Sequence, residues 1–349
     1  MTSPTDANGT TDAAVATPPT SHGAPWGKLG AIVLGLCVIV PLMLLAFVTP
    51  SINSGPEDLP LALSGPEQIT SQIQSTLDEA QPGAFEVTTY DSAAEVTAAV
   101  QERDAIGGIT VGADGAFTIT TASGAGTPYS TLLTTIGAGL TQQGASVTYD
   151  DVAPLTADDP SGVGIGSLGL PLAFGGMISA VLLSNLLKGR PWMRVLGSLT
   201  ASVAVGFVAI AILQFAFGSV DGNYVTTSLS LALGMAAISV FVLGMESLLG
   251  MAGLGIGAVL IMFIGNPISG LQTGWQWLPS PWGFIGQLLP PGAAGTLLRS
   301  DAYFAGNGGG MAIIVLSAWV LVGIVLVALS TLRKKRSGEA THVATPAAA

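Results

Sequence analysis

Charged residues are scarce in this sequence. Asp, Glu, Lys and Arg make up 9% of its 349 residues, against roughly 25% in an average soluble domain. Hydrophobic residues make up 49%, and several of their runs reach the length of about 20 residues that crosses the hydrocarbon core of a bilayer. The composition therefore excludes an ordinary water-soluble protein and predicts an integral membrane protein.

Histidine and cysteine are nearly absent. The two histidines, His22 and His342, lie in polar terminal segments, so a histidine metal site or a His-based catalytic triad is excluded. The single cysteine, Cys37, lies in an apolar run and cannot form an intramolecular disulfide. The sequence also lacks a Walker-type phosphate-binding loop. We predict no cofactor and no catalytic activity of its own, and any use of ATP requires a separate ATPase.

Basic residues are lacking between Glu57 and Asp159. Fifteen of the twenty-one acidic residues lie there beside one basic residue, Arg103. Such an acidic surface argues against binding of nucleic acid or anionic lipid. Short alternations bounded by Gly and Pro predict a mixed α/β domain here. Its expected order is β-α-β-α-β-β-α-β, with strands at 59–63, 85–90, 106–111, 116–121 and 145–149 and helices at 68–80, 93–101 and 129–143.

Six apolar runs are long enough to span, at 29–50, 169–187, 195–217, 226–247, 249–267 and 311–332. We therefore predict an α-helical polytopic membrane protein with six transmembrane helices and a small extracytoplasmic α/β domain between the first and second. The expected divisions are a disordered cytoplasmic tail at 1–27, a first helix at 28–50, the α/β domain with its linker at 51–165, helices two to six at 166–332 with a re-entrant extracytoplasmic loop at 268–310, and a cytoplasmic tail at 333–349.

The basic residues set the expected orientation. With both termini in the cytoplasm, eight of the ten obey the positive-inside rule and only Arg103 and Arg299 lie outside. The α/β domain and the 268–310 loop are then extracytoplasmic.

Four short segments, in their order, carry a resemblance to a known family. They are LPLAL at 59–63, IGGITV at 106–111, GNPISG at 265–270 and LLPPG at 288–292. Over about residues 29–332 the chain resembles the ABC type-two exporter permease family, especially its YhgE/Pip-like members. The resemblance implies a multi-pass protein of the bacterial plasma membrane, paired as a homodimer or heterodimer of permease halves and powered by a cytosolic ABC ATPase subunit. Residues 1–27 depart from the family because they lack an amphipathic helix before the first span.

The segment between the second and third spans is the candidate ATPase-coupling loop. It consists of Lys188, Arg190, Pro191, Trp192, Met193 and Arg194 around Gly189, and it resembles the family's coupling loop in position. Pro191 is expected to break the preceding helix, while Trp192 and Met193 insert into an ATPase groove. The alternative is a positive-inside anchor with an interfacial tryptophan.

Other candidate positions each have two interpretations. Gly253 and Gly257 form a small-xxx-small surface for packing within the chain or between subunits. Glu246, at a membrane-helix end, is either a proton-coupling carboxylate or a hydrated residue of the turn. The motif GIGSLG at 164–169 matches a dinucleotide fingerprint in letters only, since it leads from a linker into a membrane helix.

The resemblance implies that the 268–310 loop dips into the outer leaflet as two short helices, a role that residues 271–305 suit. Its tryptophans fit an aromatic belt, with substrate stacking as the alternative. The candidate residues are Trp275, Trp277, Pro279, Trp282, Pro290 and Pro291.

The sequence thus favours the permease of an ABC-type exporter that moves a hydrophobic or amphipathic compound outward. The alternative is a non-transporting surface protein that presents its external domain for envelope assembly, adhesion or phage recognition. A membrane-embedded enzyme is disfavoured because no nucleophile, metal cluster or deep acid pair is evident.

Overall fold

The computed structural model describes residues 26–343, so most of the two predicted tails, 1–25 and 344–349, lies outside the described residues. The chain divides into two compact units, residues 1–44 and 45–349. The helix α1 (Trp26–Ile52) begins in the first unit and ends in the second. Its side chains are exposed and apolar along most of its length, as expected of a helix whose solvent is lipid.

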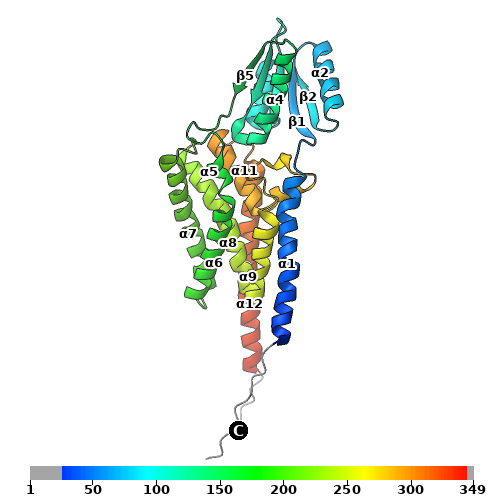
Figure 1. The fold of residues 1–349 in the computed structure, drawn as a ribbon. Coiled ribbons are helices and arrows are strands. Elements are labelled where there is room, and N and C mark those ends of the chain that lie inside the picture. Colours follow the sequence, from blue (N-terminus) through cyan, green and yellow to red (C-terminus); the bar gives the residue numbers. More distant parts are fainter. Residues whose placement is uncertain (1–25, 344–349) are drawn as a thin grey trace, which may run out of the picture. The chain divides into compact units, whose positions relative to one another are not determined.

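The α/β domain follows α1 and contains every strand and helix that the sequence predicts, with ends shifted by a few residues (Figure 1). Its elements are β1 (Leu59–Ser64), α2 (Glu67–Ala80), β2 (Phe85–Tyr90), α3 (Ala93–Glu102), β3 (Gly107–Val111), β4 (Phe117–Thr121), the 3-10 turn η1 (Ser123–Ala125), α4 (Thr127–Gln142) and β5 (Val147–Asp151).

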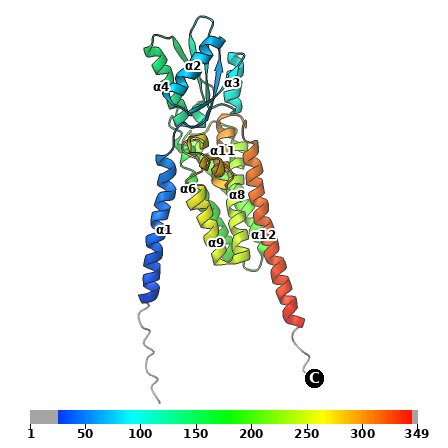
Figure 2. The ribbon, with the colours of Figure 1, turned by 90° about the vertical axis from the view of Figure 1, so that its right-hand side faces the viewer.

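The five strands form one sheet in the order β2-β1-β3-β4-β5. Only β3 and β4 pair antiparallel, while the other neighbours are parallel. Parallel neighbours require crossover helices, and the right-handed rule then puts α2 and α4 on one face and α3 on the other. In Figure 2, α4 lies on the left of the α/β domain and α3 on its right, with α2 between them in the view.

The core of the α/β domain follows the two-residue period of β1. Leu59, Leu61 and Leu63 are buried under α2 and α4, and Ala62 is buried under α3 with Val96. Burying a leucine side chain contributes about 1.5–3 kcal/mol. Helices therefore pack against both faces of the sheet.

The helical bundle contains the rest of the described chain. Its elements are α5 (Val163–Gly166), α6 (Gly169–Leu186), α7 (Pro191–Ala211), the π segment η2 (Ile212–Ala216), α8 (Tyr224–Leu249), α9 (Met251–Ala258), the π segment η3 (Val259–Gly265), the 3-10 turn η4 (Trp275–Trp277), α10 (Trp282–Gln287), α11 (Pro290–Tyr303) and α12 (Gly310–Val343).

Helix α8 is the centre of the bundle, and it is buried along most of its length. Small residues let its neighbours approach closely: a Cβ on Gly244 would lie 2.6 Å from the carbonyl oxygen of Gly323 in α12. Ser198 of α7 donates a hydrogen bond of 2.6 Å to the hydroxyl of Ser239 in α8. Close backbone approach and interhelical hydrogen bonds are the means by which helices associate in lipid.

Within residues 26–343, five helices are long and apolar enough to cross a membrane: Trp26–Pro50, Gly169–Leu186, Pro191–Ala216, Tyr224–Leu249 and Gly310–Arg333. The fifth predicted span, at 249–267, is instead a shorter apolar helix, Met251–Gly265. Gly250, with a φ of 66°, ends α8, and η3 is π-helical. The fold is thus helical and apolar with a small mixed sheet, as predicted, but its helices do not establish six spans.

Candidate functional site

The α/β domain and the helical bundle meet at α11. Pro290 and Pro291 occupy the first positions of this helix, where proline loses no helical hydrogen bond. Nearly every residue of α11 is buried. The sequence predicts two short helices in the 268–310 loop, and the structure has α10 and α11 there.

Arg299 of α11 is buried at this junction, with 4% of its surface exposed. Its Nη1 donates to the carbonyl oxygen of Gly124 at 2.9 Å, and its Nη2 donates to that of Leu271 at 2.6 Å. One guanidinium therefore joins the α/β domain, the 266–274 loop and α11. Burial lowers the pKa of Arg299 below its ordinary value.

Arg103 reaches the same helix from the α/β domain. It ends α3 in the left-handed conformation, with a φ of 69°. Its Nη1 donates to the carbonyl oxygen of Thr296 at 3.1 Å and to the hydroxyl of Ser300 at 2.6 Å. The guanidinium also lies 5.0 Å from the ring centroid of Phe304. Burial, together with the charge of Arg299, lowers the pKa of Arg103 to about 10.

Tyr129 of α4 makes a third connection at the junction. Its hydroxyl donates to Oε1 of Gln276 at 3.0 Å, and its ring packs edge-on against Trp277 at 5.8 Å. Burial raises the pKa of Tyr129 above its ordinary value. Trp277 thus packs against the core of the α/β domain, whereas Trp282 is exposed and remains compatible with an aromatic belt.

A cavity of about 660 Å³ lies beside the junction, where α6 begins. Its lining carries no charged side chain and mixes apolar groups, such as Leu170 and Trp277, with polar ones, such as Asn266 and Gln272. Gly169, the last residue of the GIGSLG motif, lets Asn266 approach, since a Cβ there would lie 2.5 Å from the Asn266 Oδ1. The motif therefore opens a helix beside this cavity, and the backbone N–H groups of Val163 and Gly164 are bound by the Asp159 carboxylate.

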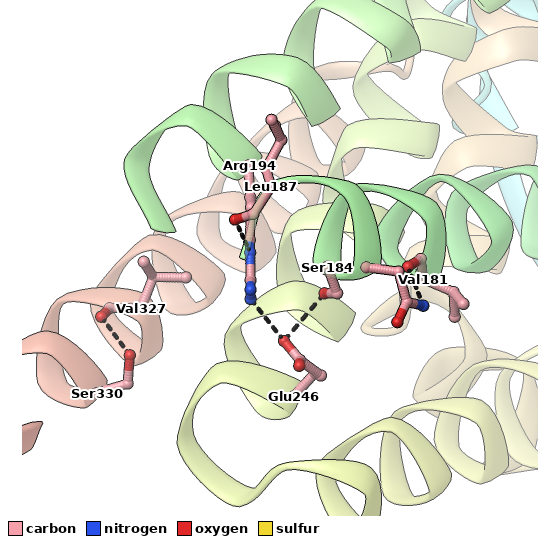
Figure 3. A network of polar contacts seen from close by, with 8 residues as sticks. Val181, Ser184, Leu187, Arg194, Glu246, Val327 and Ser330 are labelled. Carbon is pink, nitrogen blue, oxygen red and sulfur yellow. Dashed lines mark hydrogen bonds and ion pairs between the residues drawn. The ribbon is translucent and has the colours of Figure 1, made fainter. Parts of the chain in front are cut away.

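Glu246 lies at the other end of the bundle, in a contact that joins three helices (Figure 3). Its Oε2 accepts hydrogen bonds from the Ser184 hydroxyl of α6 at 3.0 Å and from Nη1 of Arg194 in α7 at 3.2 Å. Nε of Arg194 also donates to the carbonyl oxygen of Leu187 at 2.9 Å. Both Glu246 interpretations omitted this ion pair.

The candidate coupling loop divides by direction. Trp192 and Met193 point outward, with 53% and 49% of their surfaces exposed, and Lys188 and Arg190 are exposed too. Arg194 turns inward to Glu246. Pro191 is the first residue of α7, so it begins the next helix rather than breaking the preceding one, which ends at Leu186.

The glycines of α9 pack within the chain. Gly253 abuts the backbone of Met245, and a Cβ on Gly257 would lie 3.2 Å from Val242, both in α8. In the loop, Pro279 is half-buried and precedes α10. Among the described residues no group of three or more His, Cys, Asp or Glu is placed to hold a metal ion.

Sequence reasoning noted Arg103 and Arg299 only as exceptions to the positive-inside rule. Their departure from the positive-inside rule was the feature of the sequence that could have identified them. A basic residue that does not help to set the orientation needs another role. Comparisons with family models, with curated proteins and with solved structures find no match for this chain.

Proposed function

We propose that this chain is the membrane subunit of an ABC-type exporter that moves a hydrophobic or amphipathic compound outward. A separate cytosolic ATPase powers it, and two permease halves, identical or different, form the pathway. The chain lies in a bacterial plasma membrane with both termini in the cytoplasm. The family resemblance, the apolar helices and the distribution of basic residues support this reading.

The observation that carries the proposal is the uncharged cavity of about 660 Å³ beside the α11 junction. Small-molecule sites commonly have about 300–1,000 Å³ and an apolar lining with a few polar groups. This cavity has both kinds of lining, which suits a compound with an apolar body and a polar end. It also lies against the loop that Arg299 ties to the α/β domain, so movement of the domain would reshape it.

Energy has to enter through a surface that an ATPase can reach. Trp192 and Met193 are exposed at the start of α7, at the opposite end of the bundle from the α/β domain (Figure 1). Exposed aromatic and sulfur side chains of this kind are typical anchors of protein interfaces. The ion pair of Arg194 with Glu246 holds the start of α7 against α8, and Glu246 also binds Ser184 of α6. A displacement of Trp192 by a bound ATPase would therefore also move α6 and α8.

Co-purification tests the proposal. The tagged full chain is extracted from its own cells in mild detergent, and we expect an ATPase with Walker motifs to accompany it in a fixed ratio. Replacing Trp192 and Met193 by Ala is expected to remove the ATPase and abolish export while the chain remains abundant. The matched control replaces Phe215 and Phe217, which are more exposed than Trp192 and Met193 and lie in and directly after η2, and it is expected to keep the ATPase.

Two results would contradict the proposal. An unmodified chain that purifies without any ATPase favours the surface-protein alternative, in which the junction only holds the α/β domain in place. A Trp192 and Met193 double variant with normal ATPase association and full export removes the coupling role from this segment and leaves the anchor interpretation.

A further inference from the structure

The topology of the sheet leaves a strip of one face uncovered. The crossover β1-α2-β2 centres α2 over one pair of strands, and β4-α4-β5 centres α4 over another. With strands about 4.8 Å apart, these centres are separated by about 14 Å, whereas helices in contact lie about 8–10 Å apart. A gap of about 5 Å therefore remains over β3, which is close to the width of one hydrocarbon chain.

A groove occupies this gap, with a volume of about 440 Å³. We name it the α2–α4 groove. Its floor consists of the buried side chains of Ile109 in β3 and Phe85 in β2, with Phe117 of β4 beside them. Its walls are Ile73 and Leu77 of α2 and Ile136 and Leu140 of α4.

The charge of the domain avoids this groove. Fifteen acidic residues lie between Glu57 and Asp159, yet no lining residue is acidic or basic. The groove hydroxyls of Thr76 and Thr135 donate to carbonyl oxygens of their own helices. The polar groups left at its mouth are three exposed amides without a hydrogen-bond partner among the described residues: Gln72, Gln81 and Gln143.

We propose that the α2–α4 groove binds the hydrocarbon chain of a single-chain amphiphile whose headgroup carries no net charge. The width of the gap admits one chain and excludes the paired chains of a bilayer lipid. The amides at the mouth bond a neutral or zwitterionic headgroup, while the surrounding carboxylates repel an anionic one. The binding needs neither ATP nor an ATPase, so it can be tested independently of the export proposal.

Two neighbouring residues of α4 provide a matched pair of variants. Gly139 lines the groove, and a Cβ built on it meets no atom within 4 Å. Gly139→Phe therefore places a ring in the groove with no clash at its Cβ, and removal of a helix glycine itself favours the helix. Ala138 is exposed on the same helix and is not part of the groove, so Ala138→Phe is the control.

Photolabelling tests the site. The full chain, in lipid nanodiscs without an ATPase, is irradiated with a lysophosphatidylcholine that carries a diazirine near the end of its acyl chain. Labelled peptides are mapped by mass spectrometry. We expect saturable labelling of α2 and α4 that unlabelled lysophosphatidylcholine competes away. Gly139→Phe is expected to reduce this labelling by about tenfold or more, and Ala138→Phe to leave it unchanged.

Several outcomes would overturn the proposal. Labelling confined to the bundle helices removes the site, and so does labelling of α2 and α4 that Gly139→Phe leaves intact. A fatty-acid carboxylate probe that labels the groove better than the zwitterionic probe overturns the headgroup assignment. Thermal unfolding of each variant verifies that it is folded, so lost labelling is not mistaken for a lost domain.

Discussion

Arg299 donates a hydrogen bond of 2.9 Å to the carbonyl oxygen of Gly124, which lies 175 residues earlier in the chain. A buried guanidinium is commonly paired with a carboxylate, but here Nη1 and Nη2 of Arg299 donate to backbone carbonyl oxygens. The backbone fixes the positions of carbonyl oxygens. These two hydrogen bonds therefore form only when η1 and the 266–274 loop lie in the right places relative to α11. Arg103 makes the corresponding contact in the reverse direction, from the α/β domain to α11.

Arg299→Met is expected to lower the free energy of unfolding by about 1–3 kcal/mol, because the carbonyl oxygens of Gly124 and Leu271 are left without this donor. Arg299→Lys keeps the charge but not the two-pronged geometry, so an intermediate loss is expected. Thermal unfolding in detergent measures both. Arg190→Met, at an exposed arginine, is the control; equal effects at the two positions would refute the role of Arg299.

Glu246→Gln separates a structural from a proton-coupling role. The amide oxygen still accepts from Ser184, so the helices stay together, and a double-mutant cycle with Arg194→Met is expected to give a coupling energy of about 1 kcal/mol. Export by Glu246→Gln is expected to persist at a reduced rate. Complete loss of export in a variant of normal stability would identify Glu246 as a proton site instead.

Tyr303 gives the junction a dependence on alkaline pH. Burial raises the pKa of Tyr303 to about 12 from an ordinary value of 10. Below pH 10 both states are protonated; above it the unfolded state loses its proton first, so the contribution to stability falls by up to about 1.4 kcal/mol per pH unit until the folded group titrates.

Tyr303→Phe reveals this dependence by difference. The variant lacks the hydrogen bond of 2.9 Å to the carbonyl oxygen of Ser219 and is expected to be less stable at neutral pH. Thermal unfolding at a series of pH values measures the difference in stability between the unmodified chain and the variant. This difference is expected to shrink above pH 10, since the titrations of Arg103 and Tyr129 affect the stability of both proteins equally. A stability difference that stays constant above pH 10 would contradict the burial of the Tyr303 phenol.

Gly286→Ala is expected to destabilise the chain by about 1–3 kcal/mol, because a Cβ there overlaps the carbonyl oxygen of Ile268. Gly255→Ala, in α9, meets no atom within 4 Å and is expected to be neutral or stabilising. Unfolding midpoints of the two variants provide the comparison. Equal midpoints would mean that α10 does not pack tightly on the loop.

The α/β domain was predictable because its signals are local. Alternating apolar residues, helical spacing and Gly or Pro boundaries place all its strands and helices. The strand order was not predicted, since the position of β3 between β1 and β4 depends on contacts between distant residues. The groove over β3 follows from that order and was therefore invisible in the sequence.

The bundle has features that composition alone does not predict. The run 249–267 is apolar enough to suggest a span, but hydropathy does not register the positive φ of Gly250 or the π-helical turns that follow. The partners of Arg299 and Glu246 were likewise not predicted. The hydrogen bond of Arg299 and the ion pair of Glu246 each join segments that are far apart in the sequence. Pro191 was assigned to the wrong helix end, although proline favours first turns.

The shortness of α9 and η3 has a consequence for the surrounding lipid. The two segments have 8 and 7 residues, so at the α-helical rise of about 1.5 Å per residue they extend over at most about 22 Å. A bilayer core is about 30 Å thick. In the proposed membrane topology, the bilayer next to this helix would have to thin to relieve the mismatch. Headgroups would thereby be drawn toward the 266–274 loop, and an amphiphile in the adjoining leaflet would travel a shorter distance between lipid and water there.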